Sequence, residues 1–249
     1  PPYREEQIDF DRYLAYMHGQ VEELVTNYGK IDILWLDFSY SQRHGEGDKA
    51  WLGGKGKDDW ESEEMVRLVR DLQPWVLIDN RLDVEGDIFT PEQIVPREWV
   101  RHPVTGERVV WESCQTFSGS WGYYRDETSW KSPKMLIDML IQSVSLGGNL
   151  LMNVGPTARG CFDDRAEQAL SAFGKWMHFN SRSIYGCTMA EPCFHAPENC
   201  RLTEREDGKR LYIHLLNYPF EYLSMENLAD RMEYAQLLHD GGELPYRKN

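Results

Sequence analysis

The first regular feature of the chain is a helical pattern over residues 11–28. Apolar side chains recur there at the spacing of one helix face, at Leu14, Met17, Val21, Leu24, Val25 and Tyr28. Gly29 is expected to end this helix. Residues 31–37, Ile-Asp-Ile-Leu-Trp-Leu-Asp, follow as a nearly continuous apolar run, which is typical of parallel strands covered on both faces. The pattern predicts a helix followed by a strand.

The same alternation continues along the chain. Further helices are predicted from Ser62, from Ser132-Pro133 and over residues 163–183, and further strands over residues 75–79, 108–114 and 149–154. Ser62 is placed to cap the second helix, and Ser132 with Pro133 opens the third. Gly147 and Gly148 are expected to close that third helix. Alternating helices and strands favour a parallel α/β sheet.

The pattern changes after residues 184–186, Ile-Tyr-Gly. Residues 210–218 have the composition of a strand, and no strong amphipathic helix follows residue 186. We therefore predict two domains, residues 1–185 and residues 186–249, the second of which begins a small β domain.

The number of strands limits the possible folds. We count four strand-helix units between residues 31 and 183, whereas a closed (β/α)₈ barrel has eight in about 250 residues. If the fold is a barrel, half of it is missing, and the chain is expected to be part of a longer polypeptide because half a barrel has two unpaired edges. A complete doubly wound sheet is the alternative. Its phosphate-binding loop is absent, since the glycines of residues 53–57 lack the required spacing.

Charge and cysteine content narrow the possible partners. The chain has 27 basic and 41 acidic residues, a net charge of −14, so we expect neither nucleic acid nor anionic membranes as partners. Neither an apolar run of transmembrane length nor a signal peptide is evident in the sequence. The five cysteines lack metal-site spacing and are expected to be free thiols. Free thiols favour a reducing compartment such as the cytoplasm.

Asp37 is the first candidate for chemistry. It ends the apolar run of residues 31–37, and ligands of parallel α/β folds bind at the carboxyl ends of strands. A strand-end aspartate that only caps a turn is the alternative interpretation.

Glycoside hydrolysis usually takes a second carboxyl group. Glu92, after Thr90-Pro91, and Glu112, which ends the strand stretch Arg-Val-Val-Trp of residues 108–111, are the candidates, although Glu92 could also be a helix-start glutamate.

Five motifs, in order, resemble one known family, the α-L-fucosidases of glycoside hydrolase family 29. They are Tyr-Gly-Lys-Ile-Asp-Ile-Leu-Trp-Leu-Asp at residues 28–37, Ile-Asp-Asn-Arg at 78–81, Trp-Glu at 111–112, Ser-Trp-Gly-Tyr at 120–123, and Val-Ser-Leu-Gly-Gly-Asn-Leu-Leu-Met-Asn-Val-Gly-Pro at 144–156, followed by Ser-Ile-Tyr-Gly at 183–186. Two positions depart from the family pattern. Asp79-Asn80 stands where many members have Asn-Asp, and Phe38-Ser39 where many have Asp-Gly.

The resemblance implies a role for five residues. Asp37 would be the nucleophile, Glu92 the acid/base, Trp35 and Arg81 sugar-binding residues, and Trp121 an apolar wall near the C6 methyl group of fucose. It also implies that the chain is the C-terminal half of a (β/α)₈ barrel followed by the start of a β-sandwich, because the family's sugar-binding histidines lie on early strands that this sequence lacks.

The activity implied is a retaining exo-α-L-fucosidase that acts on fucosylated oligosaccharides or glycoconjugates and needs no metal or organic cofactor. In that chemistry two carboxyl groups lie about 5–5.5 Å apart and a glycosyl-enzyme ester forms. A related α-L-glycosidase with a different C6 group, for example an α-L-galactosidase, and a catalytically silent sugar-binding protein are the alternatives. Linkage preference and oligomeric state leave no signal in the sequence.

Overall fold

The computed structural model describes residues 9–37, 39 and 55–248. Phe38 and residues 53–54 of the glycine-rich loop lie outside these ranges. The chain divides into two compact units, Pro1–Thr90 and Pro91–Asn249, which are described separately below. Both combine helices with strands, as the sequence predicts. Among the described residues, no helix is both long enough and apolar enough to cross a membrane.

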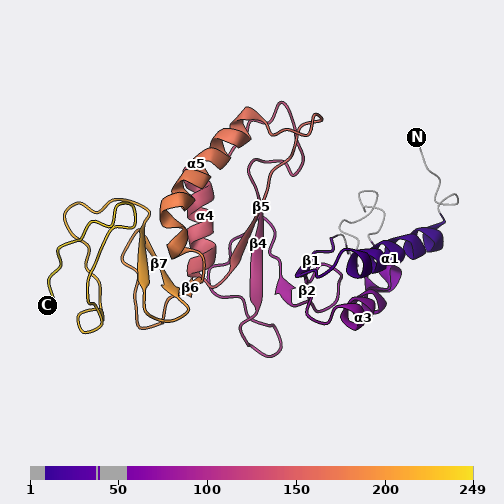
Figure 1. The fold of residues 1–249 in the computed structure, drawn as a ribbon, viewed down its shortest axis with the longest axis horizontal. Helices are drawn as coiled ribbons and strands as arrows, with labels where there is room; N and C mark the ends of the chain where they lie inside the picture. The colour runs from indigo at the N-terminus through magenta and orange to yellow at the C-terminus, as the bar shows by residue number, and fades with distance from the viewer. Residues whose placement is uncertain (1–8, 38, 40–54, 249) are drawn as a thin grey trace, which may run out of the picture. The chain divides into compact units, whose positions relative to one another are not determined.

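The first unit contains a parallel pair of short strands and the helices that pack on it (Figure 1). Its elements are α1 (Phe10–Asn27), β1 (Ile33–Leu34), α2 (Lys57–Trp60), α3 (Ser62–Leu72), β2 (Leu77–Ile78) and β3 (Ile88–Phe89). Strand β1 pairs with β2 in parallel register, Ile33 opposite Leu77 and Leu34 opposite Ile78. The strands predicted over residues 31–37 and 75–79 are therefore confirmed, but regular pairing is limited to Ile33–Leu34 and Leu77–Ile78.

The two faces of the β1–β2 pair differ. Leu34 and Ile78 are buried in a core with apolar side chains of α1 and α3, among them Val21, Val25, Met65 and Val69. On the opposite face the paired Ile33 and Leu77 remain 49% and 40% exposed. Parallel strands usually have both faces covered. The uncovered face is therefore an unusual feature of this unit.

A buried glutamine joins α1 to β1. The side-chain amide of Gln73 donates to the carbonyl oxygens of Val25 (2.7 Å) and Gly29 (2.8 Å), and its own oxygen accepts from the Ile31 amide (2.8 Å). Gly29 itself has φ +83°, which only glycine adopts readily, and it follows the helix end as predicted. The turn that leads into the Asp37 strand is therefore fixed at several backbone groups.

The predicted capping role of Ser62 is wrong. Ser62 is the first residue of α3, and Glu61 is the N-cap, with φ 49° and without a side-chain capping bond. The Ser62 hydroxyl is buried and has no hydrogen-bond partner among the residues that the structure describes. Helix α2 ends at Trp60, directly before this position, so a tight turn between two helices replaces the expected serine cap. Ser132, in contrast, caps α4 as predicted, accepting a bond from the Met135 amide (3.2 Å).

The second unit has a parallel part and an antiparallel part. Its elements are β4 (Val110–Thr116), α4 (Pro133–Ser145), β5 (Asn149–Asn153), α5 (Asp164–Asn180), the 3₁₀ turn η3 (Ser181–Ser183), β6 (Cys187–Met189), β7 (Cys200–Arg205) and β8 (Leu211–Leu215). Strands β4 and β5 pair in parallel, and β6, β7 and β8 form an antiparallel sheet. The change from parallel to antiparallel pairing follows Gly186, where the sequence pattern changes.

Helices α4 and α5 cover one face of the parallel pair. Leu136 of α4 and Ala169 of α5 are buried in a core that Phe117 and Met152 join. The opposite face carries Asn149 and Leu151 of β5, both exposed. The second unit thus has one helix-covered face, and its opposite face is exposed along β5 only, because Cys114 and Thr116 of β4 on that face are buried.

The strand predicted over residues 108–114 begins and ends two residues later in the structure. Arg108 pairs instead with Arg101 in an antiparallel bridge, and the carboxyl end of β4 is Thr116. Glu112 therefore lies inside β4, opposite Asn149, and not at its end as predicted. This position counts against Glu112 as the second carboxyl group.

Gly148 gives the first testable prediction. A Cβ atom there would overlap the indole ring of Trp111, which is fully buried, so we expect Gly148→Ala to lower the free energy of unfolding by about 2–3 kcal/mol through overpacking. Gly174, inside α5 with open space around it, is the matched control. Gly174→Ala should be neutral or stabilising by up to about 1 kcal/mol. Denaturant midpoints measure both, and equal midpoints for the two variants would contradict the packing described.

Candidate active site

Asp37 lies just beyond β1 and pairs with an arginine from beyond β2. Its Oδ1 is 3.3 Å from Nη1 of Arg81, and the two side chains are 42% and 15% exposed. Because β1 and β2 run parallel, their carboxyl ends lie at the same edge, which explains how residues 44 positions apart meet. A carboxylate at a strand end, exposed on one side and held by a largely buried cation, is suited to attack a bound ligand.

Arg81 is held by three further groups. Its Nε donates to Thr90 Oγ1 (2.9 Å), its Nη2 to the Thr90 carbonyl oxygen (3.2 Å), and its guanidinium lies 4.8 Å from the centre of the Trp35 ring. Asn80 Oδ1 in turn accepts from both the amide and the hydroxyl of Thr90, each at 2.9 Å. Trp35, Asp37 and Arg81, all predicted from the sequence, therefore form one cluster.

Asp79 is a further acidic residue of this cluster. Its carboxyl group is completely buried, and Oδ1 accepts from the Leu36 amide at 2.8 Å. Burial raises the pKa of Asp79 to about 6, while the Leu36 and Arg81 amides and the Arg81 charge oppose the shift. Gly86 lets a neighbouring loop pass directly against the Asp79 carbonyl, because any Cβ at that position would overlap it.

Glu92 lies in the second unit, in an extended segment beside β4. It forms a parallel bridge with Cys114, supported by bonds from the Cys114 amide to the Pro91 oxygen (2.9 Å) and from the Gln93 amide to the Cys114 oxygen (2.8 Å). The alternative of a helix-start glutamate is excluded by this geometry. Glu92 is exposed. Its position near the carboxyl-terminal part of β4 is compatible with a catalytic acid.

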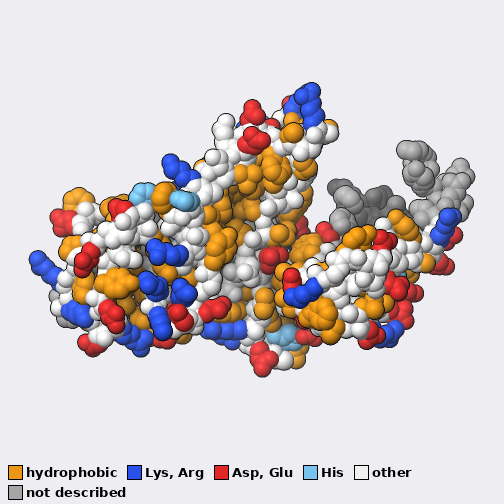
Figure 2. All heavy atoms as spheres, in the orientation of Figure 1, with side chains coloured by type: hydrophobic (Ala, Val, Ile, Leu, Met, Phe, Trp, Pro, Cys, Tyr) orange, Lys and Arg blue, Asp and Glu red, His pale blue; other side chains and the backbone are white. Residues whose placement is uncertain are grey.

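Trp121 belongs to the loop that follows β4. Its carbonyl oxygen accepts from Asn153 Nδ2 of β5 (2.6 Å), and its side chain is 41% exposed. Tyr123 and Tyr124 are also exposed and line a pocket with Asn153 and Val154 at the end of β5. Figure 2 shows apolar side chains at the surface of this unit. The carboxyl ends of this second parallel pair thus carry a group of accessible aromatic rings, as a sugar-binding wall requires.

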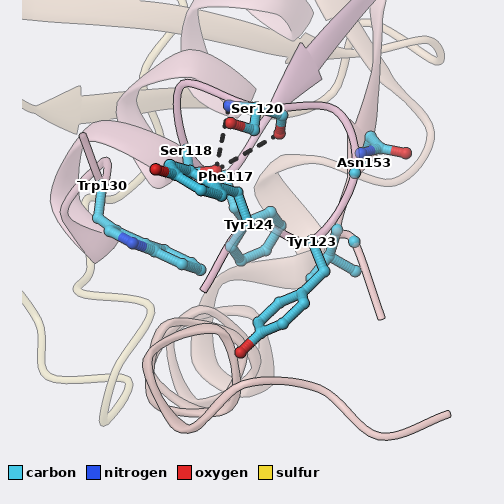
Figure 3. Close-up of a pocket in the computed structure, with 10 residues that line it drawn as sticks. Phe117, Ser118, Ser120, Tyr123, Tyr124, Trp130 and Asn153 are labelled. Atoms are coloured by element: carbon cyan, nitrogen blue, oxygen red, sulfur yellow. Dashed lines mark hydrogen bonds between the residues drawn. The ribbon is translucent and has the colours of Figure 1, made fainter. Parts of the chain in front are cut away.

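The Trp121 loop is fixed at several points. Ser120 Oγ donates to Glu127 Oε2 (2.6 Å), which lowers the pKa of Glu127 together with the bond from the Ser129 amide. Arg165 of α5 donates to the Glu127 carbonyl oxygen (2.8 Å) and stacks on Trp130 at 4.6 Å. Figure 3 shows the narrow pocket inside the loop, which Phe117, Tyr124 and Trp130 help to line. The aromatic rings are therefore presented by an ordered loop.

Comparisons with known proteins agree with this geometry. Residues 1–182 match the family model described as alpha-L-fucosidase. The chain belongs to the α-L-fucosidase family. A curated α-L-fucosidase from Dictyostelium discoideum is 27% identical over 178 residues, which is 67% of this chain and 34% of that protein.

Solved structures of this family extend the similarity to nearly the whole chain. The α-L-fucosidase isoenzyme 1 from Paenibacillus thiaminolyticus is 39% identical with a TM-score of 0.83, and covers 96% of this chain and 55% of its own. A GH29 α-L-fucosidase from Bacteroides thetaiotaomicron is 25% identical with a TM-score of 0.76, and covers 99% of this chain and 58% of its own. The chain therefore spans about a third of the curated relative and somewhat more than half of these structures.

Sequence reasoning identifies part of the candidate site and misses part. In the sequence, Asp79 stands out only as a departure from the family pattern, although it ends an apolar strand in the same way as Asp37. That shared pattern is the signal that could have identified it. Thr90 left no such signal, because its role depends on bonds to Asn80 and Arg81 that only the folded chain creates.

Proposed function

We propose that the polypeptide containing this chain is a retaining exo-α-L-fucosidase that removes terminal α-L-fucosyl residues from fucosylated oligosaccharides or glycoconjugates. The observation that carries the proposal is the Asp37–Arg81 pair at the carboxyl ends of two parallel strands, backed by Trp35. Family membership supports the same chemistry and substrate class.

The proposed reaction has two displacement steps. Asp37 attacks C1 of the fucosyl group as the C1–O bond to the leaving group breaks, while Glu92 donates a proton to the departing oxygen. Water then attacks C1 of the glycosyl ester, Glu92 takes its proton, and Asp37 is released as a carboxylate. Two inversions at C1 give net retention. Arg81 orients Asp37, and Trp121 covers the C6 methyl group of fucose.

We propose that the exposed face of the β1–β2 pair and the exposed side of β5 face the interior of a (β/α)₈ barrel, of which this chain supplies the C-terminal half. Ile33, Leu77 and Leu151 are apolar yet exposed on these faces, whereas the opposite faces are covered by helices. Such side chains are buried when barrel strands surround them. Residues 1–185 would then belong to the catalytic domain, and residues 186–249, with antiparallel β6–β8, would begin a β-sandwich.

Hydrolysis of two matched substrates tests the function directly. The protein should cleave an aryl α-L-fucoside much faster than the corresponding aryl α-L-galactoside, because the added C6 hydroxyl would be buried against an apolar wall without a partner. Faster cleavage of the galactoside would instead support the related α-L-glycosidase. Binding of fucose without any turnover would contradict the proposed catalysis.

Glu92→Ala is the test of the acid/base assignment. We expect it to slow fucosides with poor leaving groups by about 10²–10⁴-fold, and activated aryl fucosides far less, because the latter need little protonation. Steady-state rates on both substrate types measure the difference. Glu112→Ala is the matched control, since Glu112 lies inside β4, and it should not show this selectivity. If Glu112→Ala shows the selectivity and Glu92→Ala does not, the assignment is wrong.

A further inference from the structure

Asp79 is a buried carboxyl group for which the proposed mechanism has no role. It lies directly after β2 and is 0% exposed. Its Oδ1 accepts from the backbone amide of Leu36, the residue before Asp37, at 2.8 Å. Its Oδ2 has no hydrogen bond of regular geometry to any part of the chain that the structure describes. A buried, incompletely paired carboxyl group costs free energy, so its place beside the nucleophile calls for an explanation.

The bond to Leu36 restrains the end of the strand that carries Asp37. Regular β1 pairing with β2 ends at Leu34 and Ile78, so the backbone of residues 35–37 has no further β1–β2 bond. The Asp79 side chain provides the next link between the two strand ends. It therefore fixes the Trp35–Leu36 peptide unit, one residue before Asp37 and two residues beyond the last pair of the ladder.

Asp79 is also coupled to the charges of the site. The charged groups that act on it are Arg81 and Asp37: the Arg81 guanidinium lowers its pKa, and the Asp37 carboxylate raises it. Arg81 is at the same time the ion-pair partner of Asp37. One cation is thus shared between an exposed carboxylate and a buried one, and ionisation of Asp79 must alter the field at Asp37.

We propose that Asp79 is a positioning residue for the nucleophile: by holding the Leu36 amide it sets the direction of Asp37 toward the sugar and its spacing from Arg81. The proposal rests on the proposed fucosidase function and adds a residue to it. A residue with a purely structural role would change the stability of the fold, but it would leave the pH dependence of the reaction unchanged.

Two variants in the polypeptide that supplies the complete barrel test this role. Asp79→Ala removes the acceptor for the Leu36 amide, and we expect kcat on an aryl α-L-fucoside to fall about 10–100-fold with KM changed less than about threefold, since a small misplacement of a reacting group costs this much. Asp79→Asn keeps an acceptor oxygen and should retain kcat within about threefold at pH 5, where Asp79 is mainly neutral.

The pH dependence of kcat/KM distinguishes a positioning role of Asp79 from a purely structural role. Because burial raises the pKa of Asp79 to about 6, the wild-type profile of kcat/KM should contain an inflection near pH 6 that Asp79→Asn lacks. Circular dichroism and titration of active sites with a fucosyl-enzyme-forming inhibitor correct each rate for the folded fraction.

The outcomes separate the two proposals. A folded wild-type protein that does not cleave the aryl fucoside overturns the proposed function, and the role of Asp79 with it. An active wild type whose Asp79→Ala variant keeps kcat within twofold per folded site overturns the positioning role alone. If Asp79→Ala does not fold, the Asp79→Asn profile decides, and an unchanged inflection near pH 6 overturns the role.

Discussion

Asp37→Gly should abolish turnover of α-L-fucosides while leaving the fold intact. Without the carboxylate no glycosyl ester can form, and we expect kcat to fall on the order of 10⁴-fold or more, as for the loss of other enzymatic nucleophiles. Asp37 is partly exposed at a strand end and outside the apolar cores, so its removal should not unfold the protein. Steady-state rates and thermal melting measure the two effects.

Azide provides a specific check on this variant. The anion fits the space left by the missing carboxylate and can attack C1 directly, so Asp37→Gly with azide should regain activity and release a fucosyl azide of inverted configuration. Asp32→Gly is the matched control. Asp32 precedes β1 and its side chain is 76% exposed in a surface pair with Lys30, so its rate should change less than about twofold. Near-normal turnover by Asp37→Gly without azide would contradict the assignment of Asp37 as the nucleophile.

Residues 1–249 expressed alone should be poorly soluble and should not cleave aryl α-L-fucosides. The exposed apolar side chains Ile33, Leu77 and Leu151 would meet water, and strand edges would keep unpaired N–H and C=O groups. A site without its remaining wall also leaves Asp37 and the sugar exposed to water, which weakens both electrostatic action and orientation.

Adding the missing barrel strands, in the same polypeptide or as a co-expressed fragment, should restore solubility and fucosidase activity together. Size-exclusion chromatography, calorimetry and the aryl fucoside assay follow the recovery. The matched comparison is the same co-expression with Asp37→Gly, which should become soluble but remain inactive. A monomeric 1–249 protein that melts cooperatively and cleaves the fucoside would contradict the half-barrel proposal.

The elements that the sequence predicted best are those with a strong local signal. The apolar stripe of α1, the Ser132-Pro133 start of α4 and the Gly147-Gly148 stop each depend on neighbouring residues only. The capping role predicted for Ser62 is wrong because the prediction assumed an isolated helix. In the structure α2 ends at Trp60, and Glu61, in the left-handed conformation, is both the C-cap of α2 and the N-cap of α3. Strand β4 begins later than predicted because Arg108 pairs with Arg101 in an antiparallel hairpin that precedes the strand.

The site residues that could be predicted are those that belong to short sequence motifs. Asp37, Trp35 and Arg81 were identified from two short motifs, and the parallel register of β1 and β2 brings them together. The bonds of Asp79 to Leu36 and of Arg81 to Thr90 could not be predicted, because they connect residues whose approach depends on the packed fold.

Trapping the glycosyl ester tests the proposed nucleophile most directly. A 2-deoxy-2-fluoro-fucosyl fluoride carries a good leaving group, while its C2 fluorine slows hydrolysis of the ester, so the intermediate should accumulate. We predict that peptide mapping by mass spectrometry finds one fucosyl adduct, on Asp37 in the peptide that contains residues 31–37, and that Asp37→Asn abolishes it. An adduct on another carboxylate, or turnover that releases fucose with inverted configuration and no adduct, would contradict Asp37 as the nucleophile of a retaining fucosidase.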